Sequence, residues 1–185
     1  MASLPLPDLL REGGPVLVIL LLLSVAALTL VLVKLWQLAA AGILFRAPDA
    51  RPSPLPPPLF RLAVLADELR GSARLEPRLE TAARTELGIL RRGLRALEAM
   101  ASLAPLLGLL GTVLGMIRAF TELGLATGRP DPALLAGGIA QALVNTAAGL
   151  IVAILATTAL AFCEARIERL ALAMEALASR AVDAG

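Results

Sequence analysis

Three long apolar runs limit what this 185-residue chain can fold into. The first run, residues 15–33, contains only two polar side chains, Ser24 and Thr29. A helix needs about 20 consecutive apolar residues to cross the hydrocarbon core of a bilayer. Hydrophobic residues make up 58% of the chain and charged residues 17%, which is more apolar surface than a soluble domain of this length can bury. The sequence therefore predicts an integral membrane protein.

The three runs predict an all-α fold with transmembrane helices at residues 15–37, 101–123 and 132–162. A cleaved signal peptide is the competing interpretation of the first run. The run is long for a signal peptide, however, and the segment before it is not clearly basic, because Asp8 and Glu12 accompany Arg11. Aromatic residues make up only 3% of the chain, which disfavours a membrane β-barrel with its aromatic girdles.

Basic residues predict the orientation of the helices. Ten arginines lie in the loop 38–100 and three in the tail 163–185, whereas residues 1–14 and the connector 124–131 carry one each. Because positive charge is retained in the cytoplasm, we expect a multi-pass membrane protein with its N-terminus outside the cytoplasm and its C-terminus in the cytoplasm. No aromatic residues are interleaved with the arginines, so we expect no nucleic acid partner, and a basic face for anionic membrane lipid is left open.

The cytoplasmic segments are predicted to be mostly helical. The proline-rich stretch 48–58 should be extended and not helical. Residues 59–69 predict a short amphipathic helix, and residues 77–100 a longer one. With no proline before Pro105, we expect that longer helix to continue without a break into the second span. Apolar residues at helical spacing in 164–181 predict a tail helix, and these helices should pack together as a bundle.

The second and third spans combine small and polar residues. The glycines and alanine that allow close helix packing are Gly108, Gly111, Gly115, Gly138, Ala142 and Gly149. The polar residues are Thr112, Gln141, Asn145 and Thr146. A threonine can satisfy its hydroxyl on its own helix, but an amide facing lipid is costly. We therefore expect Gln141 and Asn145 to face a neighbouring helix or a water-lined path.

No span carries an acidic residue or histidine at mid-depth. Arg118 is the only charge well inside, and it either snorkels or pairs with a carboxylate of a partner. If protons cross here, a partner must supply the titrating group. Cys163 is the only cysteine and the chain has no histidine, so we expect no disulfide, metal or cofactor. With no nucleophile placed beside a base, we also expect no enzymatic activity.

Two segments carry a resemblance to a known family. They are APLLGLLGTV at 104–113, followed by Gly115 and Phe120, and GIAQAL at 138–143, followed by TAAGL at 146–150. Together they cover about sixty residues and resemble the signatures of the MotA/TolQ/ExbB proton channel family. Three spans, a periplasmic N-terminus and a large first cytoplasmic loop resemble ExbB and TolQ more than MotA, whose relatives have a fourth span.

The resemblance implies a homo-oligomer, a pentamer, around the helices of two single-span ExbD/TolR-like partners that carry an intramembrane aspartate. Thr112 and Thr146 match the pore threonines that face that aspartate, and Gln141 and Asn145 are assigned to the same pathway. Protons would be the coupling ion. The work would reach a TonB-like protein for import, or a Tol-type system for envelope maintenance. The alternative is a non-conducting oligomeric membrane scaffold, which explains the glycines but not the two threonines.

Two positions depart from the family pattern. Gln141 stands where ExbB-like proteins often carry glutamate, so a titrating group is lost there. Leu155 stands where a proline commonly follows Val-Ala-Ile, and its presence should leave the third span straighter. Neither departure affects the expected pairing of a partner aspartate with the two threonines.

Overall fold

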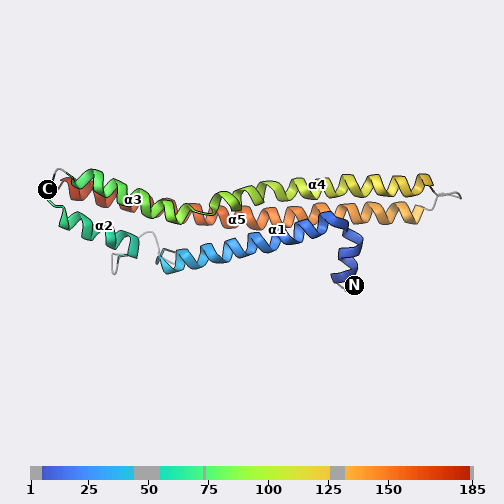
Figure 1. The fold of residues 1–185 in the computed structure, drawn as a ribbon, viewed down its shortest axis with the longest axis horizontal. Helices are drawn as coiled ribbons and strands as arrows, with labels where there is room; N and C mark the ends of the chain where they lie inside the picture. Colours follow the sequence, from blue (N-terminus) through green and yellow to red (C-terminus); the bar gives the residue numbers. More distant parts are fainter. Residues whose placement is uncertain (1–5, 44–54, 73, 126–131, 184–185) are drawn as a thin grey trace. The chain divides into compact units, whose positions relative to one another are not determined.

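The computed structural model describes residues 6–43, 55–72, 74–125 and 132–183. This part of the chain contains five α-helices and no strand (Figure 1). They are α1 (Leu6–Ala40), α2 (Pro57–Glu68), α3 (Leu75–Arg91), α4 (Leu94–Leu125) and α5 (Pro132–Asp183). Three candidate membrane-crossing segments are confirmed, one in α1, one ending in α4 and one in α5. Residues 126–131 of the predicted connector 124–131 and most of the proline-rich stretch lie outside the described residues, and the first two residues of the connector belong to α4.

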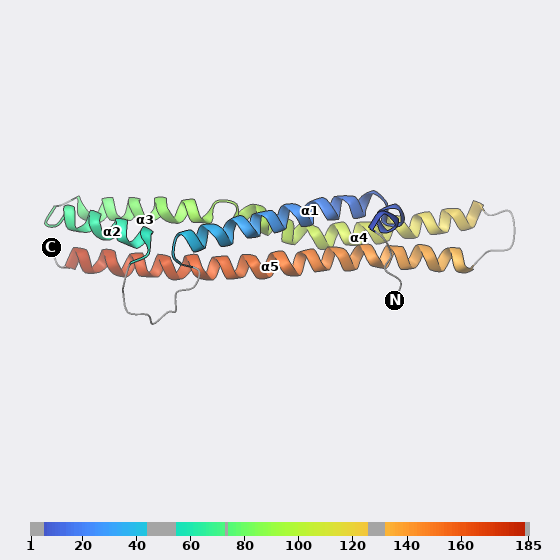
Figure 2. The same cartoon turned by 90° about the horizontal axis from the view of Figure 1, so that it is seen from below.

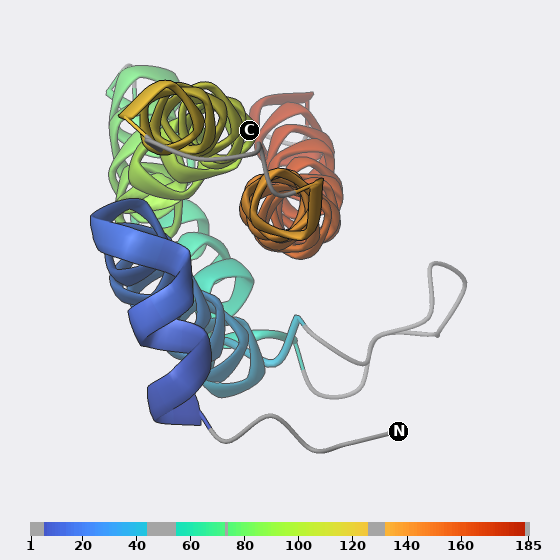
Figure 3. The ribbon, with the colours of Figure 1, turned by 90° about the vertical axis from the view of Figure 1, so that its right-hand side faces the viewer.

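The helices divide between two compact units, of which the first comprises residues 1–29 and 96–158. In this unit α4 and α5 run antiparallel and side by side, as Figures 1 and 2 show from two directions. Figure 3 shows the same pair end on, with α1 beside it. The buried cluster of this unit, Ala104, Val152 and Ala153, is contacted by Leu23 of α1. α1 bends near its start, where Pro15 lies inside the helix and removes a backbone hydrogen bond.

Large apolar side chains cover the outside of the first unit. Exposed examples on α1, α4 and α5 are Leu22, Leu28, Leu106, Leu109, Ile117, Phe120, Leu143, Ile154 and Leu155. A water-soluble monomer rarely exposes a continuous apolar surface of this kind. The surface is therefore suited to lipid or to other membrane helices.

The second unit, residues 30–95 and 159–185, has an apolar core drawn from all five helices. The fully buried side chains include Leu38, Leu62, Leu79, Cys163 and Met174. The helices expected at 59–69 and 164–181 are confirmed as α2 and as the C-terminal part of α5. One expectation is wrong at its edge: α2 begins at Pro57, so the last two residues of the proline-rich stretch are helical. Proline is tolerated in the first turn, where its missing N–H would have no partner.

The expectation of an uninterrupted helix from residue 77 into the second span is also wrong. α3 ends at Arg91 and α4 begins at Leu94. Between them Arg92 has φ −57° and ψ 134°, and Gly93 has φ +82°, a left-handed conformation that favours glycine. Apolar spacing continues across this point, and so the pattern by itself did not reveal the break.

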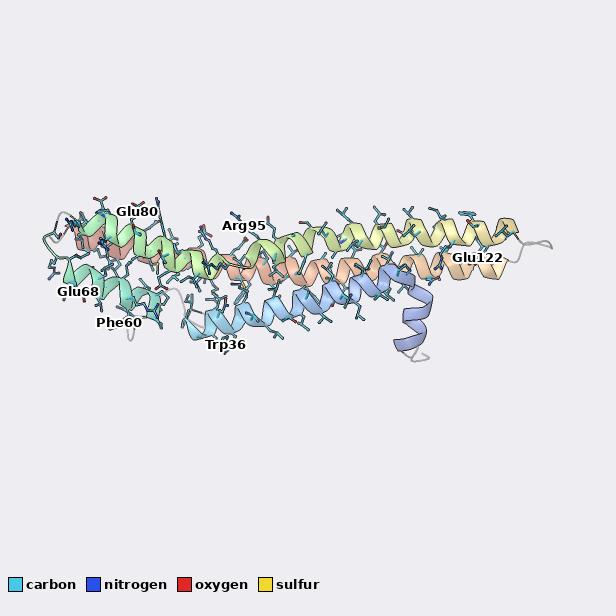
Figure 4. The ribbon with its side chains drawn as sticks, viewed as in Figure 1. Trp36, Phe60, Glu68, Glu80, Arg95 and Glu122 are labelled. Carbon is cyan, nitrogen blue, oxygen red and sulfur yellow. The ribbon has the colours of Figure 1, made fainter. Side chains whose placement is uncertain are left out.

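Lys34 lies near the C-terminal end of α1 and is only 4% exposed. Its Nζ donates to Gln37 Oε1 at 2.8 Å and to the backbone oxygen of Leu90 at 3.2 Å. Trp36, two residues later, is 73% exposed and projects away from α1 (Figure 4). Tryptophan is enriched where a membrane helix meets the headgroup region. This end of α1 therefore combines an outward aromatic side chain with an inward cation.

Candidate functional site

The candidate site is the seam along which α4 and α5 pack. Gly149 is buried, and a Cβ placed there would lie 2.5 Å from the backbone oxygen of Ala104 and 3.0 Å from Gly108 Cα. A Cβ at Gly108 would in turn lie 3.1 Å from Thr146 Cα. The two backbones are therefore in direct contact here, because neither glycine has a side chain to separate them.

The same close approach continues toward the other end of the helix pair. A Cβ at Gly115 would lie 2.9 Å from Ala142 Cβ, and one at Gly138 would lie 2.5 Å from Ala119 Cβ. The six residues predicted to serve helix packing thus all lie at the seam. The sequence analysis missed Ala104 and Ala119, although each continues the small-residue stripe, Ala104 four residues before Gly108 and Ala119 four after Gly115.

Asn145 occupies the space that Gly111 leaves open. Asn145 is 3% exposed. A Cβ added at Gly111 would lie 2.7 Å from Asn145 Cβ and 3.0 Å from Asn145 Nδ2. Of the two surroundings expected for this amide, the structure places it against the neighbouring helix of its own chain. The asparagine opposite therefore requires that residue 111 has no side chain.

Thr112 and Thr146 meet across the seam. Their Oγ1 atoms are 3.3 Å apart, and either hydroxyl can donate to the other. Each hydroxyl has a single hydrogen, and for each a backbone oxygen is the alternative acceptor: Gly108 O lies 3.0 Å from Thr146 Oγ1, and Leu109 O lies 2.6 Å from Thr112 Oγ1. Both residues are partly exposed. The structure thus brings together two hydroxyls separated by 34 positions in the sequence.

Gln141 and Arg118, the other residues predicted for the site, are not part of the Thr112–Thr146 pair. Gln141 is half-buried on α5, one residue before Ala142 of the seam. Arg118 is exposed on the surface of α4. Its position is compatible with contact to another chain, and the roles predicted for both residues stay predictions.

An open groove of about 540 Å³ lies along one face of α4, beside the hydroxyl pair. Its lining is Thr112, Val113, Met116, Ile117, Phe120 and Thr121. These residues recur every four positions, so they form one stripe of the helix. Of these residues, the sequence analysis had assigned only Thr112 to the proton pathway.

The chemistry that these side chains offer is limited to hydrogen bonding. A hydroxyl has one donor hydrogen and two acceptor lone pairs, so the threonine pair can bind both a protonated and an ionised carboxyl group. Among the described residues, no group of three or more His, Cys, Asp or Glu could hold a metal ion. The site can therefore assist proton transfer by a group that comes from elsewhere.

Residues 58–176 match the family model described as the MotA/TolQ/ExbB proton channel family. The matched range includes the whole seam and both threonines. The chain belongs to this family. The MotA/TolQ/ExbB assignment thereby confirms the resemblance carried by the two glycine-rich segments, and the three apolar helices agree with a multi-pass membrane protein of this family.

Several ExbB proteins share part of this sequence. The ExbB-like 1 biopolymer transport protein of Synechocystis is 48% identical over 80 residues, which is 42% of this chain and 32% of that protein. Biopolymer transport protein exbB1 of Vibrio cholerae is 48% identical over 62 residues, covering 34% and 27%. ExbB of Neisseria gonorrhoeae is 46% identical over 77 residues, covering 40% and 34%. The chain therefore spans about a third of the length of these MotA/TolQ/ExbB relatives.

Proposed function

We propose that this chain is the channel subunit of a motor driven by the proton motive force. It would work as a pentamer in the bacterial inner membrane, with its N-terminus periplasmic and its C-terminus cytoplasmic. The observation that carries the proposal is the Thr112–Thr146 hydroxyl pair at the α4–α5 seam. Family membership and the ExbB names of the similar proteins support it.

The titrating group would come from a second protein. The three apolar spans contain no acidic residue or histidine at mid-depth, so this chain cannot carry a proton across the membrane by itself. We infer an ExbD/TolR-like partner with a single span and an intramembrane aspartate. The threonine pair would donate to that aspartate when it is ionised and accept from it when it is protonated.

The exposed apolar stripe of α4 supports a partner or a second copy on this face. Val113, Ile117 and Phe120 are each more than half exposed in the single chain. Apolar side chains such as these can face lipid without cost, but a carboxylate beside Thr112 would need to be shielded from lipid by protein. A ring of subunits around the partner helices would provide that shielding.

Two processes are candidates for what the motor energises. A TonB-like protein would use the work for import across the outer membrane, and a Tol-type system would use it to maintain the envelope. The names of the similar proteins, biopolymer transport proteins, favour the first alternative.

A non-conducting scaffold is the second candidate function, because the glycine seam alone would serve oligomerisation. Native mass spectrometry separates the two. The chain is co-expressed with the ExbD/TolR-like protein of its own genome and the purified complex is weighed. We expect about five copies of this chain with two of the partner. A homo-oligomer that never retains such a partner would favour the scaffold.

A further inference from the structure

A second groove, of about 570 Å³, lies between α3 and the C-terminal part of α5, within the second unit. Its floor includes Leu79 and Met174, which are fully buried. Three exposed carboxylates also line it, those of Glu76, Glu175 and Asp183. This acidic groove therefore combines an apolar floor with negative charge.

The charge of the acidic groove is not neutralised within the chain. The three exposed carboxylates have no ion-pair partner in the part of the chain that the structure describes. The fourth carboxylate of the lining, that of Glu80, is paired with Arg84 at 2.6 Å, and Arg84 is the only basic residue among the described lining residues. Charge complementarity therefore favours an occupant that carries both apolar and basic side chains.

Side chains of this kind occur on another face of α5. Leu172, Ala176 and Arg180 follow one another at four-residue spacing and form one stripe, which we term the tail face. Leu172 is 60% exposed, and Arg180 is exposed without an ion-pair partner among the described residues. Successive residues of a helix are about 100° apart, so Leu172 lies about 200° around α5 from Met174 of the groove floor. One copy can therefore use the acidic groove and the tail face at the same time.

The two surfaces lie at the same level along α5. Leu172 is two residues from Met174, and Arg180 lies between Glu175 and Asp183, about 7.5 Å from the first and about 4.5 Å from the second along the helix axis. The rotation axis of a ring in a membrane follows the membrane normal, and α5 is one helix from its span to Asp183, so this axis runs roughly along α5. Rotation about such an axis leaves the level unchanged. It can therefore bring the tail face of one copy to the acidic groove of the next.

We propose that the acidic groove of one copy of this chain binds the tail face of the neighbouring copy. Leu172 packs on the apolar floor, and Arg180 pairs with Glu175 and Asp183. Because the two surfaces differ, the contact is heterologous, and contacts of this type close into rings. The inference rests on the proposed function and deepens it, because it names a contact that joins the subunits of the proposed pentamer.

Cross-linking in bacterial membranes tests the contact with two variants of the full chain, Arg180→Cys and Glu175→Cys, which carry different tags. Cys163 is fully buried and stays in place, and the unmodified chain gives the background. After treatment with a short bis-maleimide, we expect a dimer that carries both tags when the variants are co-expressed. Each variant alone should give no dimer above background, because a heterologous contact does not bring a residue to its own copy. Absence of the mixed dimer, or as much dimer from either variant alone, would overturn the proposal.

Charge reversal distinguishes a second copy from other occupants of the acidic groove. Arg180→Glu should lower the ratio of oligomer to monomer in native mass spectra of the purified chain by at least about threefold, because an attraction becomes a repulsion. Glu175→Arg combined with Asp183→Arg should have the same effect, and all three changes together should restore the ratio.

Every other pattern of ratios contradicts the proposal. A loss in Arg180→Glu that the groove changes do not restore would indicate that Arg180 binds anionic lipid. A loss only in the groove variant would indicate that the groove binds a different protein, and unchanged ratios in both variants would mean that neither surface joins the copies.

Arg78→Glu is the matched control. It makes the same change of charge on α3, at an exposed residue about 200° around the helix from Glu80, and should leave the ratio unchanged. The proposed function can fail separately. A complex that retains the partner but gives no mixed cross-link contradicts only this contact, whereas a mixed cross-link in a chain that never retains the partner contradicts only the channel function.

Discussion

At the scale of single residues, the threonine pair is the most informative feature of this molecule. Thr146 donates to the oxygen of Gly108, a bond that depends on the absence of a side chain at 108. Its hydroxyl is therefore held by the facing helix and directed to Thr112, whereas Thr158 on the same helix donates only to its own Ile154 oxygen. Two threonines of α5 thus have the same chemistry and different surroundings.

Thr146→Val should leave the subunit stoichiometry of the complex with its partner unchanged, because the substitution nearly retains the shape of the side chain. Proton flux into proteoliposomes that contain the complex should fall by at least about tenfold, the effect of losing a hydrogen bond to a charged group. Thr158→Val is the matched control and should conduct normally. Normal flux in a Thr112→Val, Thr146→Val double variant would count strongly against the proposed pathway.

At the scale of elements, the seam between α4 and α5 rests on contact between backbones. Glycine weakens a helix on its own, so its repeated use here is explained by the facing helix. Gly149 makes the closest approach to a facing backbone, because an added Cβ would lie 2.5 Å from the Ala104 oxygen. Gly137, by contrast, would place a Cβ in open space.

Gly149→Ala should therefore destabilise the helix pair by about 1–3 kcal/mol, the usual cost of overpacking, because a backbone must move to accept the methyl group. Gly137→Ala on the same helix should be neutral or stabilise by up to about 1 kcal/mol, since alanine favours helix. Thermal unfolding in detergent, followed by circular dichroism, measures both. Equal melting temperatures for the two variants would mean that the seam is looser than described.

At the scale of the whole molecule, charge and apolar surface predict how the chain sits in a membrane. Ten arginines in the loop 38–100 and three in the tail predict that these parts lie on the cytoplasmic side. The second unit, which holds most of these residues, has its own apolar core of the kind found in soluble helical bundles.

Reporter fusions test this orientation directly. Green fluorescent protein attached after Gly185 should fluoresce in intact bacteria, because it folds in the cytoplasm and not after export through the general secretion pathway. Alkaline phosphatase at the same place should be inactive, since it requires periplasmic disulfides. The opposite pair of results would reverse the proposed orientation.

The sequence by itself determined the class of fold, the three apolar helices and the family, because apolar run length and helical spacing are local properties of the chain. It also singled out Thr112 and Thr146. Only the tertiary structure decided that their hydroxyls meet, that Asn145 fills the space at Gly111, and that α3 and α4 are separate helices. These facts depend on which backbone lies opposite each residue. Beside the break at Gly93 lies Lys34, 59 positions earlier in the sequence, and no local pattern contains that contact.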